Sequence, residues 1–135
     1  LLKLMGLEDR LKDNVGLLSG GQRQALTLLM MVMSRPKMLL LDEHTAALDP
    51  RNAQIVMNLT EHFIEEYKLT ALMVTHNMQF AIDFGNRLIM MDEGTIILDV
   101  SGKEKSQLTV DELVKLFKNL RNKTYANDEA LLTKE

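Results

Sequence analysis

The chain has 135 residues, a formal net charge of −3, and a composition that is 46% hydrophobic and 26% charged, which is ordinary for one globular domain. It contains no cysteine, which excludes disulfides, thiolate catalysis and cysteine-ligated metals. Because no basic excess exists, nucleic acid is not an expected partner.

The first predicted elements are helical. Residues 1–5 resemble the end of a helix, and residues 8–18 are polar and irregular. A mostly apolar helix is predicted from residue 20 to about residue 34, and Pro36 ends it. Its most apolar stretch, residues 25–33, is much shorter than the roughly 20 residues that a spanning helix needs. We therefore expect a buried helix there.

Two short apolar runs, residues 37–42 and 70–75, predict buried parallel strands. Between them a second helix is predicted to begin at Asp49-Pro50, an N-cap acceptor followed by proline at the first helical position. The spacing of its apolar residues predicts one buried face. That face is predicted to carry Ile55, Val56, Leu59, Phe63 and Ile64.

The C-terminal part predicts a short helix over residues 78–84 and a hairpin over residues 87–99. A capping box formed by Thr109 and Glu112 opens a further helix, and the tail beyond residue 121 is polar. Strands that alternate with helices predict an α/β fold with βαβ units and a parallel sheet. We expect the hairpin at one edge of that sheet.

Polar side chains follow both predicted parallel strands at their carboxyl ends, where open parallel sheets bind ligands. Asp42 has the position of a carboxylate that holds Mg²⁺ on a nucleotide phosphate. Glu43 could orient or deprotonate an attacking water, and His76 could hydrogen-bond a γ-phosphate. Taken singly, Asp42 and Glu43 are equally well explained as polar residues that close a strand, and His76 is better explained as a capping or surface residue.

Ser19, Gly20 and Gly21 stand where the first long helix begins. A helix N-terminus carries about half a positive charge and unsatisfied N–H donors, which makes it a natural anion site. The Ser19 hydroxyl adds a donor, and the two glycines allow the backbone to approach a phosphate closely. The alternative is that Ser19 is an N-cap and that the glycines only relax the turn.

Together, four motifs in this order and spacing resemble those of the ATP-binding subunits of ABC transporters, over a stretch that reaches to about Phe117. The first is Leu18-Ser19-Gly20-Gly21-Gln22, which matches the signature motif. The second is the Walker B motif at residues 38–42, with Asp42 as its Mg²⁺ ligand, followed directly by Glu43, which matches the catalytic glutamate. The third is Ala47-Leu48-Asp49, which matches the D-loop, and the fourth ends in His76, which matches the switch histidine.

The resemblance implies part of a P-loop NTPase core with ATP and Mg²⁺ as cofactors. Residues 1–34 would belong to the helical subdomain with the signature motif, residues 35–121 to the C-terminal half of the ATPase core, and residues 122–135 to a polar tail. In the family, two subunits pair head to tail as a homodimer. Ser19 and Gly21 would then contact a nucleotide held by the other subunit.

Further partners implied by the resemblance are an integral membrane permease and a solute-binding protein, with the subunit on the cytoplasmic face of the membrane. The motifs "DEHTAALDP" and "MVTHNM" are similar to those of bacterial importers for amino acids, some of them linked with tryptophan or tyrosine uptake. Two alternatives stay open. One is an ABC ATPase of DNA repair or translation, and the other is a non-catalytic interaction module.

The sequence departs from the family in one important respect. It contains no G-x-x-x-x-G-K-[ST] phosphate loop, and no glutamine loop or adenine-stacking aromatic residue. We therefore interpret the chain as the C-terminal part of a subunit, expect it to be inactive alone, and expect exposed apolar edges that make it poorly stable or prone to assemble. His44 stands where the family usually has proline.

Overall fold

The computed structural model describes residue 3 and residues 7–119. The helix end expected within residues 1–5 and the tail over 122–135 lie outside the described residues, except for Lys3, which lies in a turn. The chain divides into two compact units, Leu1–Thr75 and His76–Glu135, and each is described by itself. The three-segment division by motif stays a prediction.

The first unit has the order that the sequence predicts, with element ends within one or two residues of the expected positions. A short 3-10 turn, η1, lies inside the stretch expected to be irregular and was not predicted. The elements are η1 (Val15–Leu17), α1 (Gly20–Met33), β1 (Met38–Asp42), α2 (Pro50–Glu66) and β2 (Thr70–Val74).

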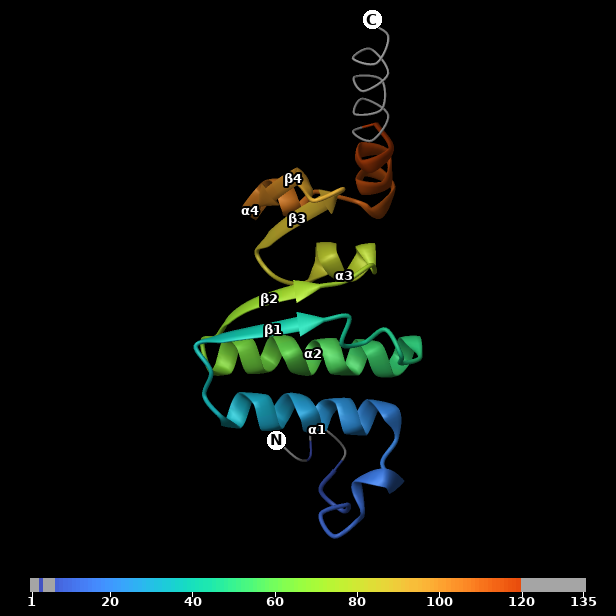
Figure 1. Ribbon diagram of the computed structural model, residues 1–135, viewed down its shortest axis with the longest axis vertical. Helices are drawn as coiled ribbons and strands as arrows, with labels where there is room; N and C mark the ends of the chain where they lie inside the picture. The colour runs from blue at the N-terminus through green and yellow to red at the C-terminus, as the bar shows by residue number, and fades with distance from the viewer. Residues whose placement is uncertain (1–2, 4–6, 120–135) are drawn as a thin grey trace, which may run out of the picture. The chain divides into compact units, whose positions relative to one another are not determined.

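The strands β1 and β2 form a two-stranded parallel sheet, with α2 as the crossover between them (Figure 1). The register runs from Met38 opposite Thr70 to Asp42 opposite Val74. Because the strands are parallel and in this register, their carboxyl ends lie side by side. The βαβ unit predicted from the sequence is therefore confirmed.

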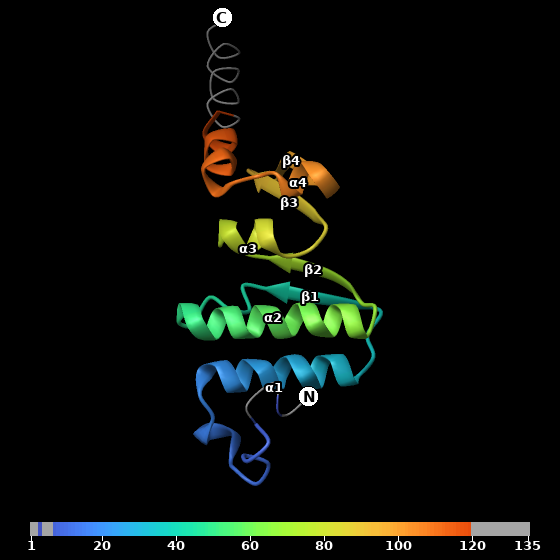
Figure 2. The same cartoon turned by 180° about the vertical axis from the view of Figure 1, so that it is seen from behind.

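The core of the first unit lies between the helices and one face of the sheet. In Figures 1 and 2, α2 runs between α1 and the two strands. Phe63 of α2 is completely buried, and Leu28 of α1 and Leu39 of β1 retain 1% and 3% exposure. Burial of such side chains is worth about 1.5–3 kcal/mol each, so this cluster is the main source of stability for the unit.

The buried face of α2 differs in one position from the predicted one. Val56, Leu59 and Phe63 are buried and Ile64 is half-buried, but Ile55 is 43% exposed. Ile55 precedes Val56 by one residue and so lies about 100° around the helix from it. The face extends instead toward Met57, which is 1% exposed.

The opposite face of the β1–β2 sheet is apolar and exposed. Met38 and Leu40 of β1 are 47% and 65% exposed, and Leu72 and Val74 of β2 are 50% and 52% exposed. Parallel sheets in folded proteins are covered on both faces. The exposed apolar face expected from the sequence is therefore present on this unit, and we call these four residues the open sheet face.

The second unit contains two short helices, a hairpin and a further helical segment. Its elements are α3 (Met78–Asp83), β3 (Arg87–Asp92), β4 (Thr95–Ser101), α4 (Gly102–Ser106) and the helical residues 110–119. The helix α4 was not predicted. It begins at Gly102, whose φ of +53° is a conformation that L-residues rarely adopt.

The hairpin of β3 and β4 has the expected position in the chain but not the expected pairing. Within the described residues the two strands pair only with each other, in an antiparallel sheet of their own. The prediction that they extend the edge of the parallel sheet is therefore not met. The chain leaves β2 through α3 and through Gly85, whose φ is +71°, before β3 begins.

Local chemistry explains the hairpin. Glu93 and Gly94 both have positive φ, +47° and +78°, as the tight type I′ turn between twisted strands requires. Across the strands, Arg87 Nη2 contacts Asp99 Oδ2 at 2.6 Å. The hydrogen bond from Arg87 lowers the pKa of the Asp99 carboxyl below its usual value.

The predicted capping box is confirmed. The backbone N–H and the hydroxyl of Thr109 donate to Glu112 Oε2 at 2.9 and 2.8 Å, and the Glu112 N–H donates to Thr109 Oγ1 at 3.3 Å. These contacts set the start of the helical residues 110–119, which place Leu113 against Leu88 and Val100 in the core of the second unit. Within the described part of the chain, no helix is both long and apolar enough to cross a membrane.

Candidate functional site

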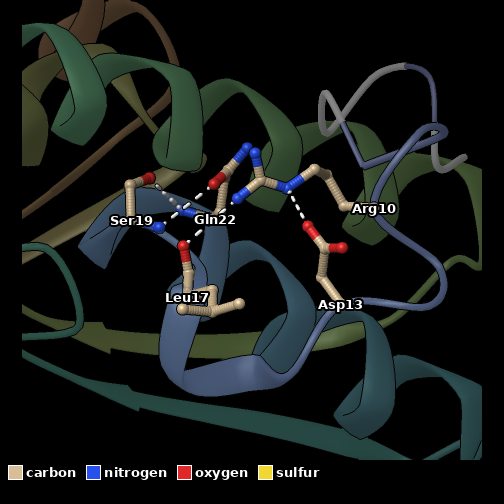
Figure 3. Close-up of polar contacts among 5 residues, drawn as sticks. All are labelled: Arg10, Asp13, Leu17, Ser19 and Gln22. Carbon is tan, nitrogen blue, oxygen red and sulfur yellow. Dashed lines mark hydrogen bonds and ion pairs between the residues drawn. The ribbon is translucent and has the colours of Figure 1, made fainter.

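The start of α1 is an N-capped helix end that presents Ser19 and Gly20 on the surface. Ser19 Oγ accepts a hydrogen bond from the Gln22 N–H at 3.2 Å, and Gln22 Oε1 accepts one from the Ser19 N–H at 3.0 Å (Figure 3). This is a capping box, so the N-cap interpretation of Ser19 is confirmed. The hydroxyl serves the cap as an acceptor, and its hydrogen can still be donated to a ligand.

Two arginines hold the backbone just before this helix. Arg10 Nη2 donates to the Leu17 carbonyl at 3.2 Å while its Nε contacts Asp13 Oδ2 at 2.5 Å (Figure 3). Arg23 Nη1 donates to the Leu18 carbonyl at 2.6 Å. Two consecutive carbonyls are thus bonded to guanidinium groups, one from a residue before the helix and one from a residue within it. These bonds restrain the backbone just before Ser19.

The glycines have a packing role that the sequence interpretation did not include. A Cβ on Gly21 would lie 3.1 Å from two side-chain atoms of Asn52, and a Cβ on Gly20 would lie 3.4 Å from Leu48 Cδ2. Neither glycine has a positive φ. Gly21 is therefore required by the close approach of α1 to the start of α2, whereas Gly20 is exposed and has room to face a ligand.

These contacts bring two of the predicted motifs together within one unit. The stretch Leu18–Gln22 and the stretch Ala47–Asp49 lie side by side, through Gly20 with Leu48 and through Gly21 with Asn52. Asp49 caps α2, with Oδ1 accepting from the Asn52 N–H at 3.1 Å and Oδ2 from Asn52 Nδ2 at 2.6 Å. The hydrogen bonds from Asn52 lower the pKa of the Asp49 carboxyl.

The two predicted carboxylates follow each other at the end of β1. Asp42 is exposed and is the last residue of the strand, and Glu43 is half-buried. Glu43 has a φ of +48°, a conformation that is uncommon for residues other than glycine. Its N–H donates to the Val74 carbonyl of β2 at 3.0 Å, and its own carbonyl accepts from the Ala46 N–H at 2.9 Å.

The backbone of Glu43 therefore turns sharply off the strand while staying bonded to its neighbour. Backbone conformations of this kind cost about 1–3 kcal/mol and cluster at functional sites. Arg35, Lys68 and Glu93 share this positive φ, so the conformation marks a sharp turn and the functional role of Glu43 stays a prediction.

His44 contacts the helix that follows it. Its Nε2 lies 3.2 Å from Thr60 Oγ1, and that hydroxyl donates to the Val56 carbonyl at 2.8 Å. Burial lowers the pKa of the His44 imidazole, which favours the neutral form of the ring.

His76 begins the second unit, where it is exposed and precedes Asn77, the N-cap of α3. The structure thus gathers the predicted residues of the signature, the D-loop and the end of β1 in the first unit, while His76 belongs to the second. The functional roles given to these residues stay predictions.

A magnesium site built from protein ligands alone is not part of the described residues. They include no group of three or more histidine, aspartate or glutamate side chains that could hold a metal ion. Mg²⁺ on a nucleotide requires only one or two carboxylates, because phosphates and water fill its remaining positions. The single exposed carboxylate of Asp42 fits that smaller requirement.

The sequence interpretation missed several residues that shape the site. Asn52 stands three residues after an N-cap aspartate, so its contact with Asp49 follows a recognisable helix-start spacing. The other residues are Arg10, Arg23 and Thr60, whose partners stand 7, 5 and 16 positions away in the sequence, and no sequence pattern points to these contacts.

A parallel sheet with acidic residues at its carboxyl end and, in the same unit, a capped helix start that carries serine and glycine are features found in α/β nucleotide-binding proteins. The family described as "ABC transporter" matches residues 1–46. Over these residues the chain is similar to the family, and its curated relatives are named as ATP-binding proteins of transport and import systems.

Two curated relatives show the range of similarity. The chain is 50% identical over 113 residues to a tyrosine transport ATP-binding protein of Clostridioides difficile, and this match covers 84% of this chain and 45% of the relative. It is 37% identical over 116 residues to a methionine import ATP-binding protein of Streptococcus mutans, which covers 82% of this chain and 33% of the relative. The chain therefore spans less than half the length of these relatives.

Solved structures give the same class. An ATP-binding cassette of an ABC transporter in its ADP conformation matches with a TM-score of 0.68 and 27% identity, covering 86% of this chain and 46% of that one. A nucleotide-free cassette matches with a TM-score of 0.66 and 25% identity over the same shares. The fold is thus that of a P-loop NTPase, as the sequence predicts.

Proposed function

We propose that this chain is the C-terminal part of an ABC transporter ATPase subunit that binds and hydrolyses ATP to drive import of a solute through a membrane permease. The main support is the arrangement of the first unit, where the start of α1 packs against the Leu48–Asn52 region and Glu43 turns off the end of β1. Names of the relatives, which concern tyrosine transport and methionine import, favour an amino acid as the solute.

In the proposed reaction, Asp42 holds the Mg²⁺ that accompanies the nucleotide. Glu43 orients or deprotonates the attacking water, and His76 contacts the γ-phosphate. The exposed Ser19 hydroxyl and the backbone at Gly20 and Gly21 bind the phosphates of a nucleotide carried by a second subunit, paired head to tail. Catalysis of phosphoryl transfer is mostly positioning and charge stabilisation.

The proposal includes the setting in which the subunit works. It would form a homodimer on the cytoplasmic face of the membrane, bound to an integral permease and served by a solute-binding protein. Because the 135 residues contain no phosphate loop, we propose that the chain alone does not hydrolyse ATP.

A second candidate is a non-catalytic interaction module, which the absence of a phosphate loop in this sequence favours. Such a module would retain the surface around Ser19 without needing Glu43. An ABC ATPase of DNA repair or translation is a less supported alternative, since the curated relatives described above are named for transport and import.

Replacement of Glu43 by glutamine separates these possibilities. The assay uses a chimaera in which residues 1–135 replace the matching segment of the Clostridioides difficile relative, so that the relative supplies the rest of the subunit. We expect Glu43→Gln to preserve MgATP binding and to lower the turnover rate by about 10²-fold or more, as loss of a general base does.

The matched control is Glu61→Gln, an exposed glutamate on α2, which should leave turnover unchanged. Full activity of the Glu43→Gln chimaera would remove Glu43 from the reaction and favour the interaction module.

A further inference from the structure

The connection between β1 and α2, residues 43–49, is held at both of its ends. At the start, the Glu43 N–H donates to the Val74 carbonyl at 3.0 Å. At the end, Asp49 caps α2 through the Asn52 N–H at 3.1 Å. We call this segment the β1–α2 connection. It carries Glu43 and the stretch Ala47–Asp49, so its conformation decides where both motifs lie.

A third anchor lies inside the connection, at His44. Its Nε2 is 3.2 Å from Thr60 Oγ1, across 16 positions of the sequence. A hydroxyl has one hydrogen to donate, and Thr60 donates it to the Val56 carbonyl at 2.8 Å. The Thr60 oxygen must therefore act as the acceptor, and His44 Nε2 must carry the proton.

Thr60 is a rigid attachment point. Thr60 is 3% exposed, and its neighbours on the same face of α2, Val56 and Phe63, are 1% and 0% exposed. A side chain that is packed on a buried helix face and bonded to the helix backbone has little freedom to move. The bond from His44 therefore ties the beginning of the β1–α2 connection to the buried face of α2.

The residue next to this anchor has an uncommon backbone conformation. Glu43 has a φ of +48°, and such conformations persist only where the surrounding structure holds them. Its backbone is bonded through its N–H to Val74 and through its carbonyl to the Ala46 N–H, and the ring of the next residue, His44, is bonded to Thr60. Loss of the His44 bond removes the tie between this part of the connection and α2.

We propose that His44 is a positioning residue, which through its hydrogen bond to Thr60 holds Glu43 in the conformation needed to direct the attacking water. The catalytic part of this inference rests on the proposed ATPase function. The anchoring part does not, because it concerns only contacts within the first unit.

The anchoring part is tested on the 135-residue chain without nucleotide. Nitrogen-15 NMR is expected to show neutral His44 with its proton on Nε2, and Thr60→Val is expected to change that tautomer signal. Amide hydrogen exchange at Ala46 and Leu48, whose N–H groups close turns within the connection, should accelerate about tenfold or more in His44→Ala and Thr60→Val, as expected for freer local opening. Thr60→Ser, which keeps the hydroxyl, should resemble the wild type.

The catalytic part is tested in the chimaera by separating kcat from KM. His44→Ala is expected to lower kcat by about tenfold, since small misplacements of a catalytic group cost one to two orders of magnitude, and to leave the KM for ATP nearly unchanged. His44→Gln should restore most of kcat, because the glutamine amide can donate from nearly the same position as Nε2. The exposed His62 of α2 provides the control, His62→Gln.

Outcomes for the two parts are distinct. A proton on Nδ1 of neutral His44, or exchange that is unchanged in Thr60→Val, would overturn the anchor whatever the enzyme does. Equal losses of kcat in His44→Ala and His44→Gln would overturn the positioning role. A chimaera with no hydrolysis at all would contradict the proposed function and the catalytic part with it, while the tautomer and exchange results would still decide the anchor.

Discussion

Ser19 combines a structural role, as the N-cap of α1, with a proposed role in binding a phosphate. Its oxygen caps α1 by accepting from the Gln22 N–H at 3.2 Å, and its hydroxyl hydrogen is assigned by our proposal to a phosphate. A substitution that removes the hydroxyl therefore affects both the cap and the proposed phosphate contact. The cap and the ligand contact can be separated only by a side chain that retains one of them.

Aspartate and alanine at position 19 make that separation. Ser19→Ala should lower the free energy of unfolding by about 1 kcal/mol through loss of the N-cap, whereas Ser19→Asp should preserve it, because aspartate is an equally good cap. In the chimaera, however, Ser19→Asp should reduce hydrolysis by about tenfold or more, since like charges a few Å apart near a surface repel by about 1–4 kcal/mol.

Chemical denaturation and a phosphate-release assay check the two effects. Wild-type turnover in the Ser19→Asp chimaera would show that no phosphate approaches this helix start.

At the scale of elements, α1 and α2 meet at a glycine. Gly21 is buried, and a Cβ there would lie 3.1 Å from Asn52, so the neighbouring side chain would have to move. Gly21→Ala should therefore destabilise the unit by about 1 kcal/mol, as overpacking by one methyl usually costs 1–3 kcal/mol and alanine returns about 0.5–1 kcal/mol in helix propensity.

Asn52, which the added Cβ at position 21 would contact, supplies the control for this prediction. In the background Asn52→Ala, the cost of Gly21→Ala should fall but not vanish, because the Cβ of residue 52, 3.2 Å from the added Cβ, remains, and a double-mutant cycle from urea denaturation measures the difference. Gly20→Ala, where the added Cβ would have an ordinary contact of 3.4 Å with Leu48 Cδ2, should not destabilise. An equal loss of stability at both glycines would argue against packing as the reason for Gly21.

The open sheet face predicts association of the chain. Leu40 and Leu72 lie opposite each other on β1 and β2 and are 65% and 50% exposed, and exposed apolar patches of this kind bind other surfaces. Sedimentation equilibrium should show a mass that rises with concentration. The double substitution Leu40→Lys with Leu72→Glu should shift the chain toward monomer.

Leu11 provides the matched control, since it is 70% exposed but lies outside the sheet. Leu11→Lys should associate as the wild type does. A wild-type chain that stays monomeric at every concentration would contradict the role of the open sheet face.

The sequence predicts the positions of the helices and strands better than it predicts which of them pair or pack together. Apolar periodicity and helix-start residues placed α1, β1, α2 and β2 to within one or two residues, because those signals are local. The separate pairing of β3 with β4 and the exposed position of Ile55 depend on which surfaces meet in space. The same limit explains why the anchor of His44 on Thr60, 16 residues away, has no signature in the sequence.

For the molecule as a whole, the family follows from the order of motifs and is supported by relatives and solved structures. The chain nevertheless spans 45% of its tyrosine-transport relative and contains no phosphate loop. We therefore propose that the chain supplies one part of an ATP site. It carries the helix start at Ser19 and the carboxylates at the end of β1, and the phosphate loop would be supplied from outside these 135 residues.

The most direct test of this account is turnover of MgATP by the 135-residue chain, measured beside the chimaera that adds the remainder of the Clostridioides difficile relative. We predict no hydrolysis and no micromolar binding of MgATP by the chain alone, with turnover restored in the chimaera and lost again in its Glu43→Gln variant. Micromolar binding together with turnover by the isolated chain would contradict the account, because a phosphate-binding element would then have to exist within these residues.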